Sequence, residues 1–240
     1  MWLGRIGAGL ALLMLGSVAA GCGGGLAAPQ AQGEVAGPVT KPRVAAFARE
    51  VRLRAGDFPG STTLPTEDSD DDENFERQPG GCSGLDLDDT TVATFETPTF
   101  RYARGEEVAA FLSEVSAAPT PYEAKNQFRL LTSKRGFNCL REVILRSAHE
   151  RAADGVEVRD VSISRLSTPL PPTPEAFGLR IGGTEVEGET ETRIYADTLA
   201  FSSGPAVVTL TAISTPTPVN QNVERVLMAT LYDRAANSDF

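Results

Sequence analysis

The chain has 240 residues, with 32 Asp or Glu against 22 Lys or Arg, so its net charge at neutral pH is −10. This excess of negative charge excludes a nucleic-acid-binding protein, because such binding rests mainly on Lys and Arg neutralising phosphates. Anionic lipid headgroups repel the chain for the same reason, so attachment to a membrane needs something other than surface charge.

Residues 1–21 have the pattern of a lipoprotein signal peptide. A single positive charge, Arg5, precedes a mostly apolar run whose residues become small at Ala19, Ala20 and Gly21. These are the basic region, the apolar region and the cleavage site of a secretory signal. The apolar run is shorter than the ~20 residues that a membrane-spanning helix needs.

Cys22 follows these small residues directly, and the stretch resembles the bacterial lipobox, with Ala19 where Leu or Val is commoner. We predict that Cys22 is the lipidation site and that acyl chains such as palmitate attach the protein to the membrane. Each buried acyl methylene contributes about 0.8 kcal/mol. The alternative is plain secretion with a free Cys22. Cleavage before Cys22 leaves a mature chain with a net charge of −11.

Residues 22–43 are rich in Gly, Ala, Pro and Gln and show no apolar periodicity, which predicts a flexible tether with a reach of roughly 25 Å. Residues 44–240 are long enough for a single extracytoplasmic domain with its own core. The spacing of Val44, Phe47 and Val51 predicts that this domain opens with a short helix.

The acidic run at 67–76 is predicted to be a solvated loop, because its carboxylates repel one another and little there is apolar. Its weak candidates for metal ligands are Asp68, Asp70 and Asp72. An EF-hand loop that starts at Asp70 would have Phe75 at the Gly position and Gly81 at the Glu position, so the calcium motif is not met.

Cys82 and Cys139 remain if Cys22 is acylated. An even pair in an oxidising compartment predicts a disulfide. Closing this loop of 58 residues stabilises the fold by roughly 4 kcal/mol in the chain-entropy model. Two buried free thiols are the alternative, and a metal site is disfavoured because the chain has only one histidine, His149.

The middle of the chain predicts one or two short strands followed by three helices. Residues 91–103 are rich in Thr, Phe, Val and Tyr, as strands are. Residues 105–117 have apolar residues at helical spacing, with Glu106 and Glu107 in the first turn. A helix opened by Pro121 is expected to stop at Gly136, and another follows to about 152. The apolar positions of these helices are Val108, Phe111, Leu112, Val115, Ala124, Phe128, Leu131, Leu140, Val143, Ile144 and Ser147.

The last third predicts antiparallel strands and a final helix. The alternating segment 155–166 slips near Asp160, which suggests a bulge. Two further strands are expected around a turn at 202–205, after a strand at 177–183. Asn220 is expected to cap a helix with an apolar face of Val223, Val226, Leu227 and Leu231. The element order predicts an α+β fold, an antiparallel β-sheet packed with helices.

No constellation in the sequence predicts an enzyme or a cofactor. His149 has no Gly-x-Ser-x-Gly nucleophile to serve, and no phosphate-binding loop is present. Glutamates alternate with other residues at Glu185, Glu187, Glu189 and Glu191. This pattern is more typical of one charged face of a hairpin than of a glycosidase dyad. We expect no cofactor and no catalytic residue.

Three segments together resemble a known family. They are "LRAGDFPGST" near residue 53, the spaced Cys82 and Cys139, and the closing stretch from Arg193 to Ala235. The matching positions of the closing stretch are Asp197, Phe201, Gly204, Val207, Val208, Leu210, Pro216, Pro218, Leu231 and Arg234. The chain resembles the LpqN/LpqT-type lipoproteins and the extracellular sensor domains of PknH-type receptor kinases, although it has no kinase domain.

The resemblance implies a PsbP-like α/β sandwich and a binding or sensing role in the cell envelope, without a catalytic site. The first hypothesis is a lipid-anchored, non-enzymatic domain that binds a small apolar or envelope ligand in a pocket between sheet and helices. The second is a structural or assembly lipoprotein that docks another envelope protein, through a sheet edge, the acidic loop or an exposed apolar patch. A hydrolase with convergent carboxylates is a distant third.

Overall fold

The computed structural model describes residues 37–58, 64–65, 91–104, 107–153, 157–166 and 175–240. The strands are β1 (Leu64–Pro65), β2 (Ala93–Glu96), β3 (Phe100–Arg104), β4 (Glu107–Ala117), β5 (Glu157–Arg165), β6 (Ala176–Glu187), β7 (Thr190–Ser203) and β8 (Ala206–Thr215). The helices are α2 (Lys41–Val51), the short 3-10 helix η1 (Ala55–Asp57), α3 (Pro121–Thr132), α4 (Lys134–Ala153) and α5 (Gln221–Ala236).

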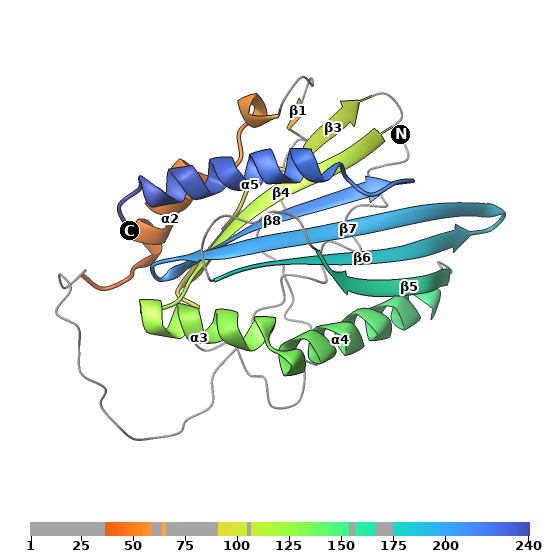
Figure 1. Cartoon of the computed structure of the whole chain (residues 1–240), viewed down its shortest axis with the longest axis horizontal. Coiled ribbons are helices and arrows are strands. Elements are labelled where there is room, and N and C mark those ends of the chain that lie inside the picture. The colour runs from red at the N-terminus through yellow and green to blue at the C-terminus, as the bar shows by residue number, and fades with distance from the viewer. Residues whose placement is uncertain (1–36, 59–63, 66–90, 105–106, 154–156, 167–174) are drawn as a thin grey trace.

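The strands form one antiparallel sheet in the order β1-β3-β4-β8-β7-β6-β5, and β2 pairs with β4 next to β3. Helices α2 and α5 pack on one face of the sheet, and α3 and α4 pack on the other (Figure 1). The α+β class predicted from the sequence is therefore confirmed. Alternate side chains along each strand face opposite helix layers, so the two faces have separate interiors.

The face under α2 and α5, which we call the α2/α5 face, holds the larger hydrophobic core. Four aromatic rings meet there, with Phe58 at 5.4 Å from both Phe100 and Phe111 and Tyr102 at 6.0 Å from Phe111. Helix α2 is the first predicted helix, and it begins at Lys41 because a proline in the first turn has no N–H to leave unpaired.

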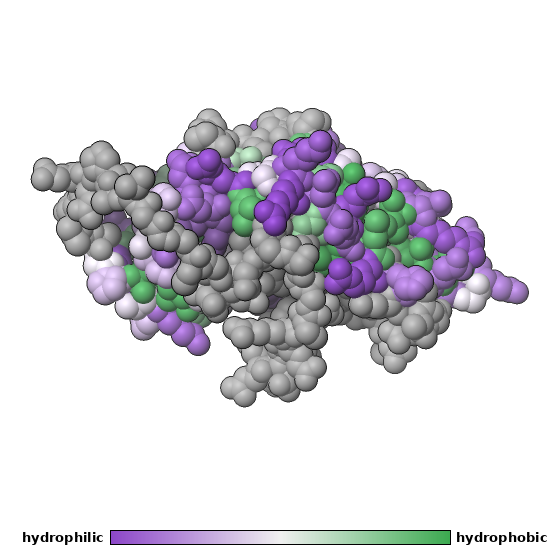
Figure 2. All heavy atoms as spheres, turned by 90° about the horizontal axis from the view of Figure 1, so that it is seen from below, coloured by the Kyte–Doolittle hydropathy of each residue, from purple (hydrophilic) through white to green (hydrophobic). Residues whose placement is uncertain are grey.

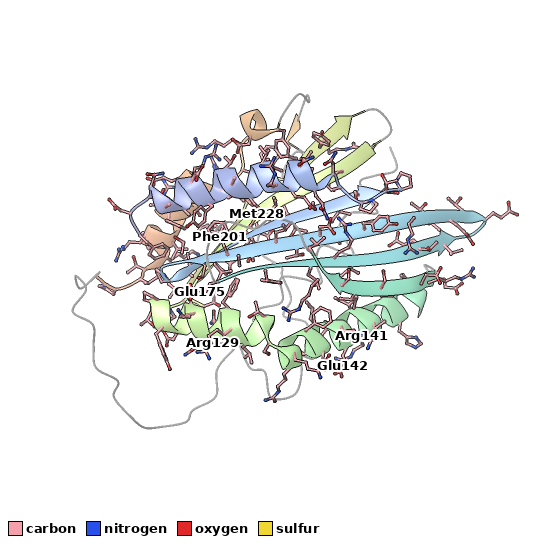
Figure 3. All side chains as sticks on the ribbon, in the orientation of Figure 1. Arg129, Arg141, Glu142, Glu175, Phe201 and Met228 are labelled. Carbon is pink, nitrogen blue, oxygen red and sulfur yellow. The ribbon has the colours of Figure 1, made fainter. Side chains whose placement is uncertain are left out.

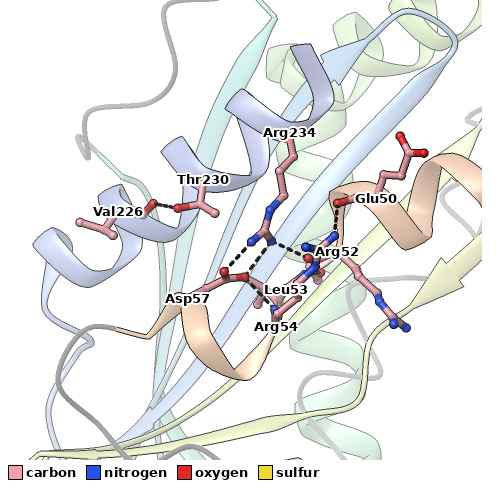
Figure 4. A network of polar contacts seen from close by, with 9 residues as sticks. Glu50, Arg52, Leu53, Arg54, Asp57, Val226, Thr230 and Arg234 are labelled. Carbon is pink, nitrogen blue, oxygen red and sulfur yellow. Dashed lines mark hydrogen bonds and ion pairs between the residues drawn. The ribbon is translucent and has the colours of Figure 1, made fainter. Parts of the chain in front are cut away.

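An ion pair joins η1 to α5 beside this core (Figure 4). Arg234 donates to both carboxylate oxygens of Asp57 at 2.6 and 2.8 Å, and also to the carbonyl oxygen of Arg52 at 2.8 Å. Asp57 in turn accepts a hydrogen bond from the backbone N–H of Arg54 at 2.7 Å. The loop after α2 is thus attached to the last helix of the chain.

The prediction of a helix at 105–117 was wrong, because this segment is the long strand β4. Strand β4 is hydrogen-bonded to β8 along ten residues and to β2 and β3 on its other side. The spacing that suggested a helix also fits a strand. Val108 and Leu112 lie on one face of the strand, and Phe111 and Val115 lie on the other. Residues four positions apart share a face in a strand as well as in a helix, so this spacing alone does not separate the two.

Helices α3 and α4 form where the sequence predicts helices, but their boundary lies elsewhere. The predicted stop at Gly136 was wrong, since α3 ends at Thr132 and Gly136 lies within α4. Ser133 makes the break: its hydroxyl donates to the carbonyl of Leu130 at 2.6 Å and accepts from the N–H of Gly136 at 3.0 Å. A serine side chain therefore ends one helix and caps the next.

The strands of the last third confirm their predictions. The register of β5 shifts between Arg159 and Ser162, with Asp160 at φ 51°, and the β7–β8 turn uses Gly204 at φ 58°. Asn220 caps α5 as expected. The predicted apolar face of α5 is correct apart from Val226, which is exposed, and the buried face includes Glu224 and Met228 instead.

Candidate functional site

The residues predicted to form sites lie mostly beyond the reach of the structure. Cys22, Cys82 and the acidic candidates Asp68, Asp70 and Asp72 fall outside the described residues. Cys139 lies half-buried in the second turn of α4. The Cys82–Cys139 disulfide and the lipidation of Cys22 stay predictions.

The candidate groups for catalysis are not brought together. His149 is exposed on α4. Glu185 is buried within β6 opposite Thr192, whereas Glu187 lies exposed at the end of β6 opposite Thr190. Among the described residues, no group of three or more His, Cys, Asp or Glu side chains could hold a metal ion. The described part of the chain therefore supplies no metal centre.

Charged residues are buried on both faces of the sheet. On the α2/α5 face, Arg180 of β6 forms a bidentate ion pair with the fully buried Asp197 of β7, with Nε and Oδ1 2.6 Å apart. The hydrogen bond to Asp197 raises the pKa of Arg180, and the buried Glu224 of α5 adds to this effect. Each of these charges faces an opposite charge, as buried charges must.

The opposite face, under α3 and α4, carries a different set of polar residues. We call this the α3/α4 face, and we define the polar strip as Glu96 of β2, Glu114 of β4, Thr209 and Thr211 of β8 and Thr198 of β7. Glu96 lies opposite Glu114, Glu114 opposite Thr209, and Thr211 opposite Thr198. Thr198 also lies opposite Leu179, which packs against Ile144 of α4. The strip thus crosses four strands beneath the helices.

The two glutamates of the polar strip form a hydrogen-bonded carboxyl pair. Glu114 is 6 % exposed, whereas Glu96 is exposed at the edge of the strip. Burial of Glu114, together with the charge of Glu96 and the hydrogen bond from one side chain to the other, raises the pKa of Glu114 to about 8. At neutral pH Glu114 therefore holds its proton.

Three oxygens of the polar strip have no hydrogen-bond partner within the described part of the chain: Glu114 Oε2, Thr198 Oγ1 and Thr211 Oγ1. Thr211 is fully buried and Thr198 is 7 % exposed. A buried polar group without a partner costs roughly 1–3 kcal/mol. These oxygens are donor and acceptor positions that a bound molecule would satisfy.

Helix α3 covers the strip and is held at its N-terminal end. Lys125 of α3 forms an ion pair with Glu175, and Ser202 donates to Glu175 at 3.0 Å. Phe128 packs edge-on against Phe177 of β6, with ring centroids 5.6 Å apart. In Figure 3, Glu175 lies between the start of α3 and the sheet, on the opposite side of the strands from Met228 of α5.

Sequence reasoning missed the polar strip, and the error in β4 explains why. Read as a helix, 105–117 places Glu114 on a solvated face opposite the apolar stripe. Read as a strand, the same segment puts Glu114 on one face with Val108 and Leu112. Glu114 then lies opposite Thr209 of β8, and Leu112 lies opposite Thr211. One signal of a polar face was present in the sequence, because Thr209 and Thr211 alternate with apolar residues along a strand that was predicted correctly.

The outer surface of the α3/α4 layer is mixed rather than apolar (Figure 2). Of the large hydrophobic side chains that the structure describes, three are exposed: Tyr122 on α3, Leu145 on α4 and Val226 on α5. No helix among the described residues has the length and hydropathy to cross a membrane.

The solved structures that are similar to this chain include two proteins of Mycobacterium tuberculosis. No family model and no curated protein matches the chain. The extracellular domain of PknH from Mycobacterium tuberculosis is 13 % identical with a TM-score of 0.37, over 84 % of this chain and 98 % of that one. LpqN, described as involved in cell envelope biogenesis of the same organism, is 12 % identical with a TM-score of 0.26, over 84 % and 94 %. These are the two types of protein that the sequence resembles, but at such scores neither structure defines a site or a function for this chain.

Proposed function

We propose that this protein is a lipid-anchored, extracytoplasmic envelope lipoprotein whose α+β domain binds a small ligand at the polar strip, without catalysing a reaction. The ligand site lies between the sheet and α3, in the layer where a pocket was predicted from the sequence. It differs from the predicted pocket for an apolar ligand in being polar, because it contains carboxyl and hydroxyl groups.

The single observation that carries the binding role is the set of unpartnered oxygens on neighbouring strands. Glu114, Thr198 and Thr211 are each more than nine-tenths buried. Within the described ranges, none of their three oxygens named above has a partner. On the α2/α5 face the buried Asp197 is paired by Arg180, and the hydroxyls of Tyr102 and Ser214 are also without a partner in the described ranges, but they do not line up on neighbouring strands with a buried carboxyl group. A domain that only needed stability would gain from valine in place of the two threonines.

The alternatives draw less support. Docking of another protein would use a continuous apolar patch, and Tyr122, Leu145 and Val226 are single exposed residues on three different helices. Hydrolysis of a glycoside needs two carboxyl groups separated widely enough to hold the scissile bond between them. Glu96 and Glu114 are hydrogen-bonded to each other instead.

The binding role is tested by native mass spectrometry of the protein purified from its own host. We expect a bound small molecule that is lost when Thr198 and Thr211 are both replaced by valine. Ser214→Ala is the matched control, because Ser214 is also a buried, unpartnered hydroxyl but lies on the α2/α5 face. An empty wild-type protein, or equal loss of the molecule in the control, contradicts the proposal.

The anchor is tested separately with Cys22→Ser. Without the thiol no acyl chain is attached, so we expect the variant to leave the membrane fraction and appear in the soluble extract. The reason is the loss of about 0.8 kcal/mol per buried methylene. Full retention of the variant in washed membranes would refute lipidation at Cys22.

A further inference from the structure

The negative charge of the chain is distributed unevenly over the fold. The segment 121–153, which forms α3 and α4, carries seven Lys or Arg against three Glu, a net charge of +4. The rest of the chain therefore carries −14. Strand β5, which packs beside α4, has two acidic and two basic residues and leaves this balance unchanged. The α3/α4 helices thus form a positively charged layer on an acidic protein.

Six cations of these helices are exposed, and we call their surface the basic layer: Lys125, Arg129, Lys134, Arg135, Arg141 and Arg146. Lys125 is paired with Glu175, and Arg135 and Arg146 also take part in interactions. The side chains of Arg129, Lys134 and Arg141 form no hydrogen bond or ion pair with the described residues. In Figure 3, Arg129 and Arg141 lie on the opposite side of the sheet from Met228. The basic layer therefore keeps cations available to an external anion.

Arg165 of β5 adds a further positive charge where α3 meets α4. Its side chain donates to the carbonyl of Thr132, the last residue of α3, at 2.6 Å. Its guanidinium group also lies 5.7 Å from the centre of the Phe137 ring. These contacts hold the exposed Arg165 beside the start of α4, where Lys134 lies. Positive charge is therefore concentrated at the junction of the two helices.

Two exposed apolar side chains lie among these cations. Tyr122 is 73 % exposed on α3, and Leu145 is 40 % exposed on α4. Tyr122 shares a helix face with Lys125, and Leu145 shares one with Arg141, because residues three or four positions apart are neighbours on a helix. Basic residues beside exposed aromatic and aliphatic groups are typical of surfaces that meet lipid headgroups. A soluble polyanion would use the same cations but would gain nothing from the two apolar groups.

We propose that the basic layer lies against the anionic headgroups of the membrane that holds the protein, so that α3 and α4 face the lipid and α5 faces away from it. This inference rests on the lipid anchor of the proposed function. The acyl chains attach the protein, and a tether with a reach of roughly 25 Å keeps the domain near the headgroups. The basic layer then decides which side of the domain meets them.

The attraction of the basic layer is stronger than the repulsion from the rest of the chain. Each Lys or Arg near an anionic surface strengthens binding about fivefold, so the three cations without a described partner favour the contact roughly a hundredfold. The charges of the sheet and of α2 and α5 lie behind the α3/α4 helices. A helix is about 10 Å thick and the Debye length at physiological salt is about 8 Å, so salt largely screens those charges from the membrane.

Single tryptophans can report the orientation of the domain. Trp2 is the one tryptophan of the chain and lies in the predicted signal peptide, so the mature protein has none. Tyr122→Trp places a reporter on α3, and Val226→Trp places a matched reporter at an exposed position of α5, on the other side of the sheet. Each acylated variant is reconstituted into vesicles of phosphatidylcholine with brominated acyl chains, with or without phosphatidylglycerol.

Phosphatidylglycerol should separate the two reporters. In its presence at low salt, bromine should quench the emission of Tyr122→Trp and the emission maximum should shift to the blue, whereas Val226→Trp should be unaffected. In molar NaCl, where the Debye length is about 3 Å, the emission of Tyr122→Trp should recover. Without phosphatidylglycerol the two reporters should respond alike.

Charge reversal locates the effect. Lys134→Glu with Arg141→Glu removes two cations from the basic layer and should weaken its contact with the vesicle about thirtyfold or more, so the quenching of Tyr122→Trp is lost. Lys41→Glu with Arg225→Glu is the matched control. It changes the net charge equally at exposed positions of α2 and α5, and it should leave the quenching in place.

Several results would overturn the inference: equal quenching of both reporters, equal quenching with and without phosphatidylglycerol, or equal loss in the control pair. No response of Tyr122→Trp to phosphatidylglycerol would also overturn it, and would leave the basic layer to an acidic protein or to the acidic run at 67–76. Flotation with the vesicles is measured first. Protein that fails to float with phosphatidylcholine alone refutes the anchor, and the inference falls with it.

Discussion

The two faces of the sheet are built from the same strands but bury different kinds of polar group. On the α2/α5 face, aromatic rings fill the centre and the buried Asp197 is paired by Arg180, while the hydroxyls of Tyr102 and Ser214 have no partner among the described residues. On the α3/α4 face, the apolar cluster around Ile144 is smaller, and the polar strip beside it contains unpartnered oxygens. The first face thus combines the larger apolar core with an ion pair, and the second combines a smaller apolar cluster with the buried carboxyl group where we propose that a ligand binds.

The largest expected difference between the faces concerns core truncation. Phe111→Ala should destabilise the domain by about 3–5 kcal/mol, because Phe111 is enclosed by Phe58 and Tyr102 and its cavity cannot collapse. Phe128→Ala on α3 should cost less, since its described ring contact is to Phe177 alone and a helix at the rim can shift. Urea unfolding of both variants checks this. Equal losses would remove the distinction between a rigid and an adaptable face.

The predicted disulfide tests how much a covalent bond to α4 stabilises the α3/α4 layer. Cys139 lies on α4, so a bond to Cys82 fastens the α3/α4 layer. Cys82→Ala should lower the melting temperature under non-reducing conditions, with a loss of roughly 4 kcal/mol in the chain-entropy model. Under reducing conditions wild type and variant should melt alike. An unchanged melting temperature without reductant would rule the bond out.

Removal of the ion pair between Asp57 and Arg234 tests how much a paired charge on the α2/α5 face contributes to stability. Arg234→Ala should destabilise the domain by about 1.5–3 kcal/mol, because it leaves the mostly buried Asp57 without its charged partner. Arg234→Lys should recover only part of the loss, since a lysine cannot bond both carboxylate oxygens and the Arg52 carbonyl in the same planar geometry. Full recovery by lysine would mean that charge alone matters here.

The smallest expected change, counted per pH unit, is in the free energy of unfolding, and it comes from the titration of Glu114 on the α3/α4 face. The pKa of Glu114 is raised in the folded domain, to about 8. Between its ordinary pKa and 8, the unfolded chain loses this proton while the folded chain keeps it. The free energy of unfolding should therefore fall by up to roughly 1.4 kcal/mol per pH unit across this range and level off above it.

The matched variant for this pH dependence is Glu114→Gln. It should flatten the decline and be more stable than wild type at pH 8, because it never ionises. Chemical denaturation at pH 5, 6, 7 and 8 gives both curves. A wild-type stability that rises over this range would contradict the assignment of a buried, protonated Glu114.

Much of the α2/α5 face could be predicted from the sequence. The apolar positions of α2 and α5, the capping Asn220 and the β7–β8 turn follow from local patterns, since periodicity and turn chemistry are local. Two of the positions that carry the family resemblance, Asp197 and Arg234, turn out to be ion-paired here, and Arg234 pairs with the aspartate of "AGDFPG". The resemblance thus rests in part on residues that hold the fold together.

The candidate site could not be predicted in the same way. Glu114 becomes buried because β4 pairs with β8, a strand about a hundred residues later in the chain. Local spacing in 105–117 is compatible with a helix and a strand, and only the long-range pairing decides between them. The carboxyl pair with Glu96 depends on the same choice, since β2 and β4 must be neighbours before the two side chains meet.

A carbon-13 NMR titration of the glutamate side-chain carboxyl groups tests the central claim most directly, with Glu114→Gln to assign the signal. If the polar strip buries a protonated Glu114 beside Glu96, the Glu114 carboxyl titrates with a midpoint near pH 8. A midpoint at the ordinary glutamate value, about 4.3, would show that the carboxyl is ionised and already satisfied, which would contradict the account.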